Sequence, residues 1–141
     1  RFAEDTQDVT GTETAVNLDT AVGEKIAAFE GVVTPDADFT YQVEDVYYAV
    51  ITEYTGNEAV VIVPEAIDEY KVRGLADGVF REKNDLKAIA LPDTVTAIGN
   101  YAFNDCAGLT DIQLPNGLTS IGDRAFYGCH GLTSVSLPDS V

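Results

Sequence analysis

The sequence has little of the chemistry that most enzyme sites need. Among 141 residues there are one histidine, two cysteines, no methionine and no tryptophan. A single histidine, His130, excludes a His-rich metal site and leaves Ser-His or Cys-His catalysis resting on one side chain. Two cysteines are too few for a disulfide scaffold. A phosphate-cradling loop ending in Lys-Ser/Thr, a Gly-x-Ser-x-Gly elbow and a His-Glu-x-x-His pair are all missing. We therefore predict a protein that is not an enzyme, with no catalytic, metal or cofactor site.

Basic residues are also scarce. The chain has 24 acidic and 8 basic residues, a net charge of −16, and residues 1–46 hold 11 of the acids and 2 of the bases. Such a surface repels polyphosphate, so nucleic acid and anionic membrane are poor partners. The charge serves either as a solubility device for a secreted or surface protein, or as an acidic docking surface for a basic partner.

Long apolar runs are missing too, so no segment inserts into a membrane. No run approaches the ~18 residues that cross a bilayer. No signal peptide is visible, and the chain begins with Arg1 rather than Met. We expect a mature or trimmed chain whose leader has been removed.

What the sequence does have is a repeat. Residues 86–108 (LKAIALPDTVTAIGNYAFNDCAG) and 109–131 (LTDIQLPNGLTSIGDRAFYGCHG) are both 23 residues long and identical at 11 positions, and residues 132–141 begin the pattern again. A 23-residue unit cannot bury its own apolar side, so it must stack on a copy of itself. The run Leu-x-x-Ile-x-Leu predicts a short strand, ended by the proline that follows it. We expect Gly99 and Gly122 to mark turns with positive φ.

The pattern extends weakly upstream. Residues 60–64 (VVIVP) match the strand, and Val72 matches Val95 after a five-residue insertion. This degenerate first coil carries Lys83 where later coils have cysteine. Ahead of it, residues 46–54 and 59–64 flank Thr-Gly-Asn-Glu and are interpreted as a β-hairpin cap.

The remaining N-terminal part carries no repeat. Residues 1–13 are almost without apolar side chains and are expected to form a disordered or loosely attached tail. Residues 17–30 place apolar side chains on one helical face, which predicts a short helix within a 14–38 helix-and-linker segment. Residues 39–85 then form the cap and first coil, and residues 86–141 the repeats, the last one incomplete. The fold class is a mainly β solenoid.

The stretch from Leu91 to Val141 closely resembles the BspA-like leucine-rich repeats, with Leu-Pro-x-x-Val/Leu-x-x-Ile-Gly-x-x-Ala-Phe-x-x-Cys twice in full and once in part. These repeats occur in surface and secreted proteins of gut and oral bacteria and in some mucosal protozoa. The resemblance implies an open, curved solenoid at the cell surface or outside the cell. It also implies adhesion or host-protein binding, and no chemistry. The family has no fixed binding motif, so no residue role is carried over.

Three groups of residues remain as candidates for chemistry. Cys106 and Cys129 occupy equivalent positions one coil apart and are either buried inert thiols, a disulfide pair or, less well supported, part of a metal site. His130 is expected to face solvent. The acidic pairs Asp36/Asp38 and Glu44/Asp45 are either solvated loops or calcium ligands, although no EF-hand spacing is present.

The outer surface of the coils carries the candidate binding residues. The strand positions that face away from the apolar ladder form one expected face, namely Lys87, Ala88, Ala90, Thr110, Asp111, Gln113, Thr133, Ser134 and Ser136. The turn side offers Tyr101, Arg124 and Tyr127, types that dominate tight interfaces.

These surfaces leave two hypotheses besides a remote enzymatic one. The chain is a binding module for a protein or glycan of a host or neighbouring cell, or it is a structural spacer in a larger surface protein. Because the last coil is uncovered, we expect either that more repeats follow Val141 or that this end self-associates.

Overall fold

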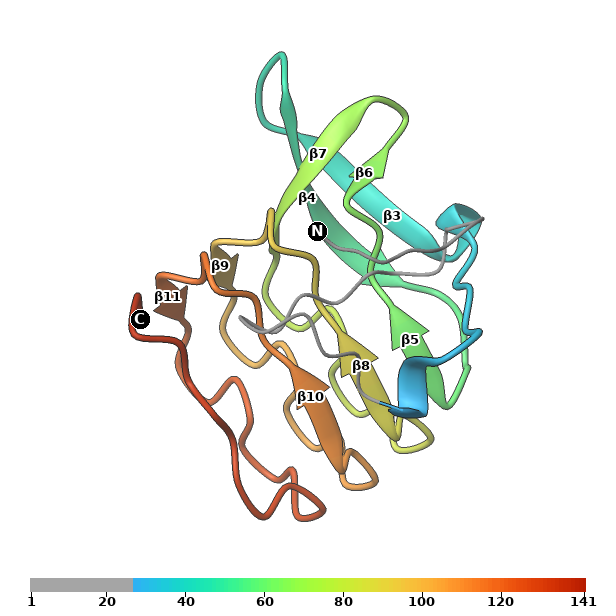
Figure 1. Ribbon diagram of the computed structural model, residues 1–141, viewed down its shortest axis with the longest axis vertical. Helices are drawn as coiled ribbons and strands as arrows, with labels where there is room; N and C mark the ends of the chain where they lie inside the picture. Colours follow the sequence, from blue (N-terminus) through green and yellow to red (C-terminus); the bar gives the residue numbers. More distant parts are fainter. Residues whose placement is uncertain (1–26) are drawn as a thin grey trace.

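The computed structural model describes residues 27–141. The expected tail (1–13) and residues 14–26 of the expected helix and linker lie outside the described residues. The last part of the helix prediction falls on a single 3-10 turn, η1 (Ala27–Phe29), and a second turn, η2 (Asp36–Asp38), lies within the expected linker. The rest is a β-solenoid, which confirms the predicted fold class (Figure 1).

The coils are held together by two sheets. The smaller sheet has three parallel strands in the order β10 (Asp111–Gln113), β8 (Ala88–Ala90), β5 (Val60–Ile62). The larger sheet has the order β11 (Ser120–Ile121), β9 (Ala97–Ile98), β7 (Tyr70–Leu75), β4 (Tyr48–Tyr54), β3 (Phe39–Val43), with β6 (Ala66–Ile67) paired to β7. Parallel strands require a crossover between them, and each 23-residue unit supplies one.

The register of the strands reproduces the sequence repeat. Ile89 pairs with Ile112, and Leu75 pairs with Ile98, in each case 23 residues apart. The pairing of Val61 with Ile89 is longer by the five inserted residues. The insertion is accommodated in the hairpin of β6 and β7, whose loop residues Asp68 and Glu69 both have positive φ. That is the backbone of the two-residue turn that matches strand twist.

The core is a set of side-chain ladders that run along the stack. Phe80, Phe103 and Phe126 stack with their rings 1° from parallel and centroids 5.2 and 5.3 Å apart. Tyr54 extends the stack beyond Phe80 at 5.2 Å, in a tilted arrangement. The spacing exceeds the strand separation only slightly, as expected for offset rings on neighbouring coils. Each aromatic side chain therefore covers the one before it.

The N-terminal cap is a hairpin, but the sequence interpretation assigned the wrong strands to it. β3 and β4 are the antiparallel pair, while β5 joins the other sheet. The Thr-Gly-Asn-Glu loop does not join two paired strands. It wraps the buried Tyr54, whose hydroxyl accepts the N–H of Glu58 at 3.2 Å. The loop thus carries the chain from the cap sheet to the first coil.

The interpretation of the repeat glycines is also wrong. Gly99 and Gly122 do not have positive φ. Within the repeats, the left-handed positions form two columns, Gly78/Tyr101/Arg124 and Glu82/Asp105/Gly128. Gly122 is needed because the previous coil passes close to it, and a Cβ there would lie 2.6 Å from the carbonyl carbon of Gly99. Close approach of backbone is the second physical reason for a glycine.

The third unit departs from the ladder. Its residues 132–138 contain no strand, although Ser134 and Ser136 lie 23 residues after Asp111 and Gln113. Val135 and Leu137 are 36% and 55% exposed. Within the described residues this segment has one neighbouring coil, whereas β8 has one on each side.

Candidate functional site: the outer strand face

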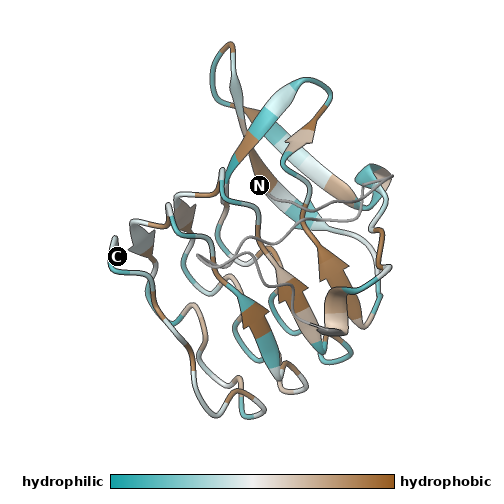
Figure 2. Ribbon diagram, in the orientation of Figure 1, coloured by the Kyte–Doolittle hydropathy of each residue, from teal (hydrophilic) through white to brown (hydrophobic). Residues whose placement is uncertain are grey.

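The outer face of the three-stranded sheet changes character from one coil to the next. At β8 it carries Ala88 and Ala90, and at the equivalent positions of β10 it carries Asp111 and Gln113. Figure 2 shows hydrophobic colour along β5 and β8 and mixed colour along β10. The face therefore has an apolar half and a polar half.

The apolar half is covered by the chain's own N-terminal segment. Phe29 of η1 is 1% exposed and packs with Ile62, Ala88 and Ala90, the last two being 2% and 0% exposed. In Figure 1, η1 lies beside β5 and β8. The expectation that Ala88 and Ala90 form part of one continuous open face is thus wrong, because an aromatic side chain from a distant part of the chain occupies the space above them.

The same segment also closes one edge of the sheet. The N–H of Ile62 donates to the hydroxyl oxygen of the buried Thr34 at 2.8 Å. β5 is the end strand of its sheet, and an unpaired edge N–H is a template for another strand. We call residues 29–34 the strap, since they cover both a face and an edge.

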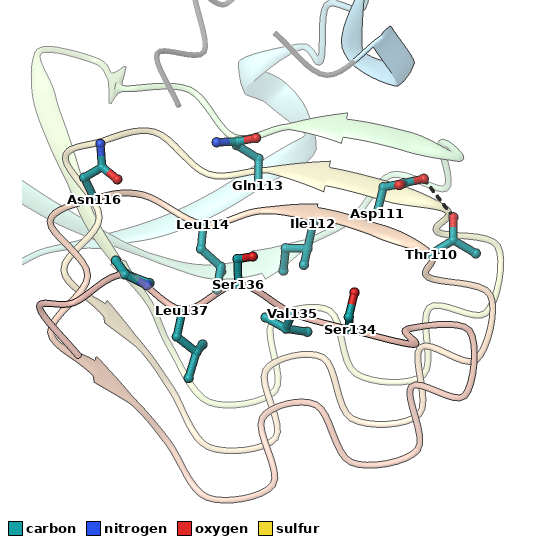
Figure 3. Close-up of a pocket in the computed structure, with 11 residues that line it drawn as sticks. Thr110, Asp111, Ile112, Gln113, Leu114, Asn116, Ser134, Val135, Ser136 and Leu137 are labelled. Atoms are coloured by element: carbon teal, nitrogen blue, oxygen red, sulfur yellow. Dashed lines mark hydrogen bonds between the residues drawn. The ribbon is translucent and has the colours of Figure 1, made fainter. Parts of the chain in front are cut away.

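The polar half is open and hollowed. A groove of about 460 Å³ lies between β10 and residues 134–138. The groove is lined by Thr110, Asp111, Ile112, Gln113, Leu114, Asn116 and residues 134–138. Figure 3 shows β10 and the last segment on opposite sides of it. Five of the residues predicted from the sequence line this groove: Thr110, Asp111, Gln113, Ser134 and Ser136.

The edge of β10 contributes backbone groups to the groove. Asp111 donates its N–H to the carbonyl of Lys87 at 3.2 Å, and the carbonyl of Gln113 accepts the N–H of Leu91 at 3.1 Å. Both bonds point toward β8. Because backbone groups alternate sides along a strand, the N–H and carbonyl of Ile112 face the groove. The groove thus offers strand-edge groups beside carboxylate, amide and hydroxyl side chains.

The remaining predicted face residues lie at the rim. Lys87 is exposed at the start of β8, and Thr133 is exposed ahead of the last segment. The hydroxyl of Thr110 donates to the carbonyl of Lys87 at 3.2 Å and lies 3.0 Å from Oδ2 of Asp111. These contacts of the Thr110 hydroxyl fix the position of the Asp111 carboxylate at one end of the groove.

The turn-side residues form a separate cluster away from the groove. Tyr101 and Tyr127 are 36% and 62% exposed, and the guanidinium of Arg124 lies 5.6 Å from the Tyr127 ring centroid. The sequence reasoning missed Arg81, whose guanidinium lies 5.4 Å from the Tyr101 ring centroid. Tyr101 and Arg124 share one left-handed column, which only the backbone geometry reveals.

The two cysteines are free, buried thiols. Sγ of Cys106 donates to the carbonyl of Phe80 at 3.0 Å, and Sγ of Cys129 makes the same bond to Phe103. Burial, with Cys129 nearby, raises the pKa of the Cys106 thiol to about 12. A thiol that stays protonated is a poor nucleophile. The two free, buried thiols therefore favour the inert-thiol alternative over the disulfide. His130 is exposed, unlike the two cysteines, and it does not line the groove.

Of the two acidic pairs, Glu44/Asp45 has structural partners. Asp45 accepts the N–H groups of Tyr47 and Tyr48 at 2.9 and 3.1 Å, which closes the β3–β4 turn. Glu44 and Asp45 pair with Arg73 at 3.2 and 3.8 Å, and the Arg73 guanidinium stacks 3.8 Å from the Tyr48 ring centroid. Over residues 27–141, no three His, Cys, Asp or Glu side chains gather as a metal site.

An Asx ladder went unnoticed in the sequence reasoning. Oδ1 of Asp77 accepts the N–H of Asn100 at 2.8 Å, and Oδ1 of Asn100 accepts that of Asp123 at 2.7 Å. The sequence contains the signal for this ladder, because the three residues follow one another at intervals of 23. Their hydrogen bonds join successive coils, so the ladder has a structural role.

Comparisons with known proteins agree with this geometry. Residues 73–141 match the family model described as BspA type leucine rich repeat region, in six copies. A comparison with curated proteins gives no match. Among solved structures, a leucine-rich repeat protein of T. pallidum is 35% identical with a TM-score of 0.72, over 74% of this chain and 50% of that one. The present chain thus spans half of that protein's length.

Two further structures extend the likeness. A leucine-rich repeat protein from Bacteroides capillosus is 28% identical with a TM-score of 0.70, over 79% of this chain and 86% of that one. A leucine rich cell surface protein from Faecalibacterium prausnitzii is 30% identical with a TM-score of 0.63, over 77% of this chain and 31% of that one. The repeats, their register and these likenesses together show that residues 73–141 are leucine-rich repeats of the BspA type.

Proposed function

We propose that the chain is a non-enzymatic binding module, secreted or displayed at a cell surface. Its ligand is a protein or glycan of a host or neighbouring cell. The observation that carries this proposal is the groove beside β10, where the strand-face residues expected from the sequence surround an open volume. A repeat protein creates binding sites from side chains on successive coils, and this groove draws on two of them.

The chemistry of the groove favours a polar ligand. Asp111, Gln113 and Asn116 supply carboxylate and amide groups, and Ser134 and Ser136 supply hydroxyls. These groups can pair with the hydroxyls of a sugar or the backbone of an extended peptide. The groove has no aromatic side chain, so the affinity per contact is expected to be modest, as in a wet interface.

Surface display is supported by two observations. The Faecalibacterium structure is described as a cell surface protein, and the acidic charge suits an exposed location. Within residues 27–141 no helix has the length and apolar character of a membrane span.

The test is binding of the full chain to an array of immobilised matrix proteins and glycans. A groove variant, Asp111→Lys with Gln113→Lys, is compared with a control, Asp123→Lys with Ser120→Lys. The control makes the same change in net charge at exposed positions outside the groove. Circular dichroism verifies that both variants fold.

We expect to find a ligand for which the groove variant has at least tenfold lower affinity than the native chain. The control variant should keep the native affinity. Binding that survives in both variants would overturn the groove as the site and move attention to Tyr101, Arg124 and Tyr127. An array without any ligand would favour the alternative function, a structural spacer. That alternative draws support from the greater length of the Faecalibacterium protein, of which this chain covers 31%.

A further inference from the structure

The apolar half of the strand face is a binding site that the strap fills. The Phe29 side chain fills the space over Ala88 and Ala90, and Thr34 accepts the edge N–H of β5. The phenyl ring and the hydroxyl lie five residues apart on one short segment, which turns at Glu30 and Gly31. The sheet therefore recognises two side chains of a short linear segment.

The sequence of the face is adapted to that occupant. Alanine stands at 88 and 90, whereas the next coil carries Asp111 and Gln113 at the same register. A longer side chain at either alanine would fill the volume that the phenyl ring takes. The small side chains are therefore a recess for an aromatic ring rather than a feature common to all coils.

The attachment of the strap is light. Within the strap, Glu30, Gly31 and Val33 are exposed, with Val33 at 77%. Phe29 and Thr34 are buried, and Val32 is partly buried. The cluster that Phe29 and Val32 join is separate from the main ladder core. Over the described residues, one hydrogen bond joins the strap to the sheet, donated by the N–H of Ile62 to the Thr34 hydroxyl. Displacing the strap disturbs none of the Phe80–Phe126 ladder.

We propose that the face and edge of β5 and β8 form a docking site for a short polypeptide segment that turns between a phenylalanine and a threonine five residues later. The strap occupies this site in cis. A segment of the same pattern from another molecule binds it when the strap is absent or weakened.

The cis occupant sets the size of the expected effect. A tethered segment competes at an effective concentration on the order of millimolar. The apparent Kd for a free peptide is the intrinsic Kd divided by the fraction of molecules whose site is empty. A variant that weakens the strap should therefore bind the free peptide at least ten times more tightly than the native chain.

The experiment uses the full chain and a fluorescein-labelled peptide of residues 27–35, AAFEGVVTP. Fluorescence anisotropy is measured with the native chain and with Phe29→Ala, whose folding is verified by circular dichroism. Thr34→Val is a second variant, which removes only the edge hydrogen bond. The control peptide, AAAEGVVTP, lacks the phenyl ring.

We expect saturable binding of the peptide to Phe29→Ala, at least tenfold weaker binding to the native chain, and none of the control peptide. The affinity of Thr34→Val for the peptide should lie between those of the native chain and Phe29→Ala. The proposal is overturned if no protein binds the peptide saturably, if native chain and variants bind it equally, or if the control peptide binds as well. The groove variant Asp111→Lys with Gln113→Lys should bind the peptide unchanged in the Phe29→Ala background, so this proposal and the proposed function fail separately.

Discussion

The aromatic stack gives a stability difference that depends on position in the stack. Phe103 is fully buried and has a ring on each side, whereas Phe126 has one ring neighbour and is half-buried. We consider the same substitution, Phe→Leu, at both. Leucine keeps most of the apolar volume and removes the ring contacts, so the comparison isolates the stack.

The magnitude follows from the number of ring pairs. Each aromatic pair contributes about 0.5–1.5 kcal/mol beyond its buried area. Phe103→Leu removes two pairs and should therefore cost about 1–3 kcal/mol from stacking, plus about 1 kcal/mol for the reshaped core. Phe126→Leu removes one pair at a site that is already partly hydrated, and should cost about 1 kcal/mol in total.

The assay is urea unfolding followed by far-UV circular dichroism, since the chain has no tryptophan. The free energy of unfolding is compared at equal m, because an altered m signals loss of two-state behaviour in a repeat stack. If Phe126→Leu destabilises as much as Phe103→Leu, position in the stack does not matter and the ladder account is refuted.

Three further outcomes are expected. Gly122→Ala should lower the free energy of unfolding by about 1–3 kcal/mol, because the new Cβ meets the previous coil. Gly78→Ala has open space around it but a φ of 69°, so it should lower that free energy by about 1 kcal/mol. Equal losses in urea titrations would refute the close-approach argument. Glu69→Gly should raise the free energy of unfolding by about 0.5–1 kcal/mol, because glycine relieves the left-handed turn residue at φ 76°; a lower Tm would contradict this. The raised pKa of Cys106 means that its contribution to stability is complete below the ordinary thiol pKa near 9 and is lost as pH rises toward about 12. The native chain should therefore lose more stability than Cys106→Ala between pH 9 and 11, and parallel pH profiles would contradict the assignment.

The repeat was predictable because each coil imposes the same requirement on the next. Ile89 and Ile112 must share a ladder once the period is 23, and the strands, insertion and buried cysteines follow. The cap hairpin was not predictable by turn chemistry. Thr-Gly-Asn-Glu has typical turn residues but wraps Tyr54, whereas the true turn at residues 44–47 has no glycine and is closed by the Asp45 carboxylate.

The outward-facing polar residues were predictable, whereas the groove beside them and the boundary of the polar half were not. Alternation along a strand identifies Asp111 and Gln113 as outward-facing residues without any coordinates. Phe29 contacts Ala88, which lies 59 residues later in the sequence, and no repeat pattern relates the two positions. The available signal was indirect: alanine at two positions where the next coil carries polar side chains.

The central claim is that the strand face has one half closed by the strap and one half open at the edge of β10. Amide hydrogen exchange measured by NMR tests both halves in one sample. The N–H of Ile62 should exchange slowly in the native chain and faster in Thr34→Val, because its acceptor is the Thr34 hydroxyl. The N–H of Ile112, facing the groove, should exchange quickly. Rapid exchange at Ile62, or protection at Ile112 equal to that at Ile62, would contradict the account.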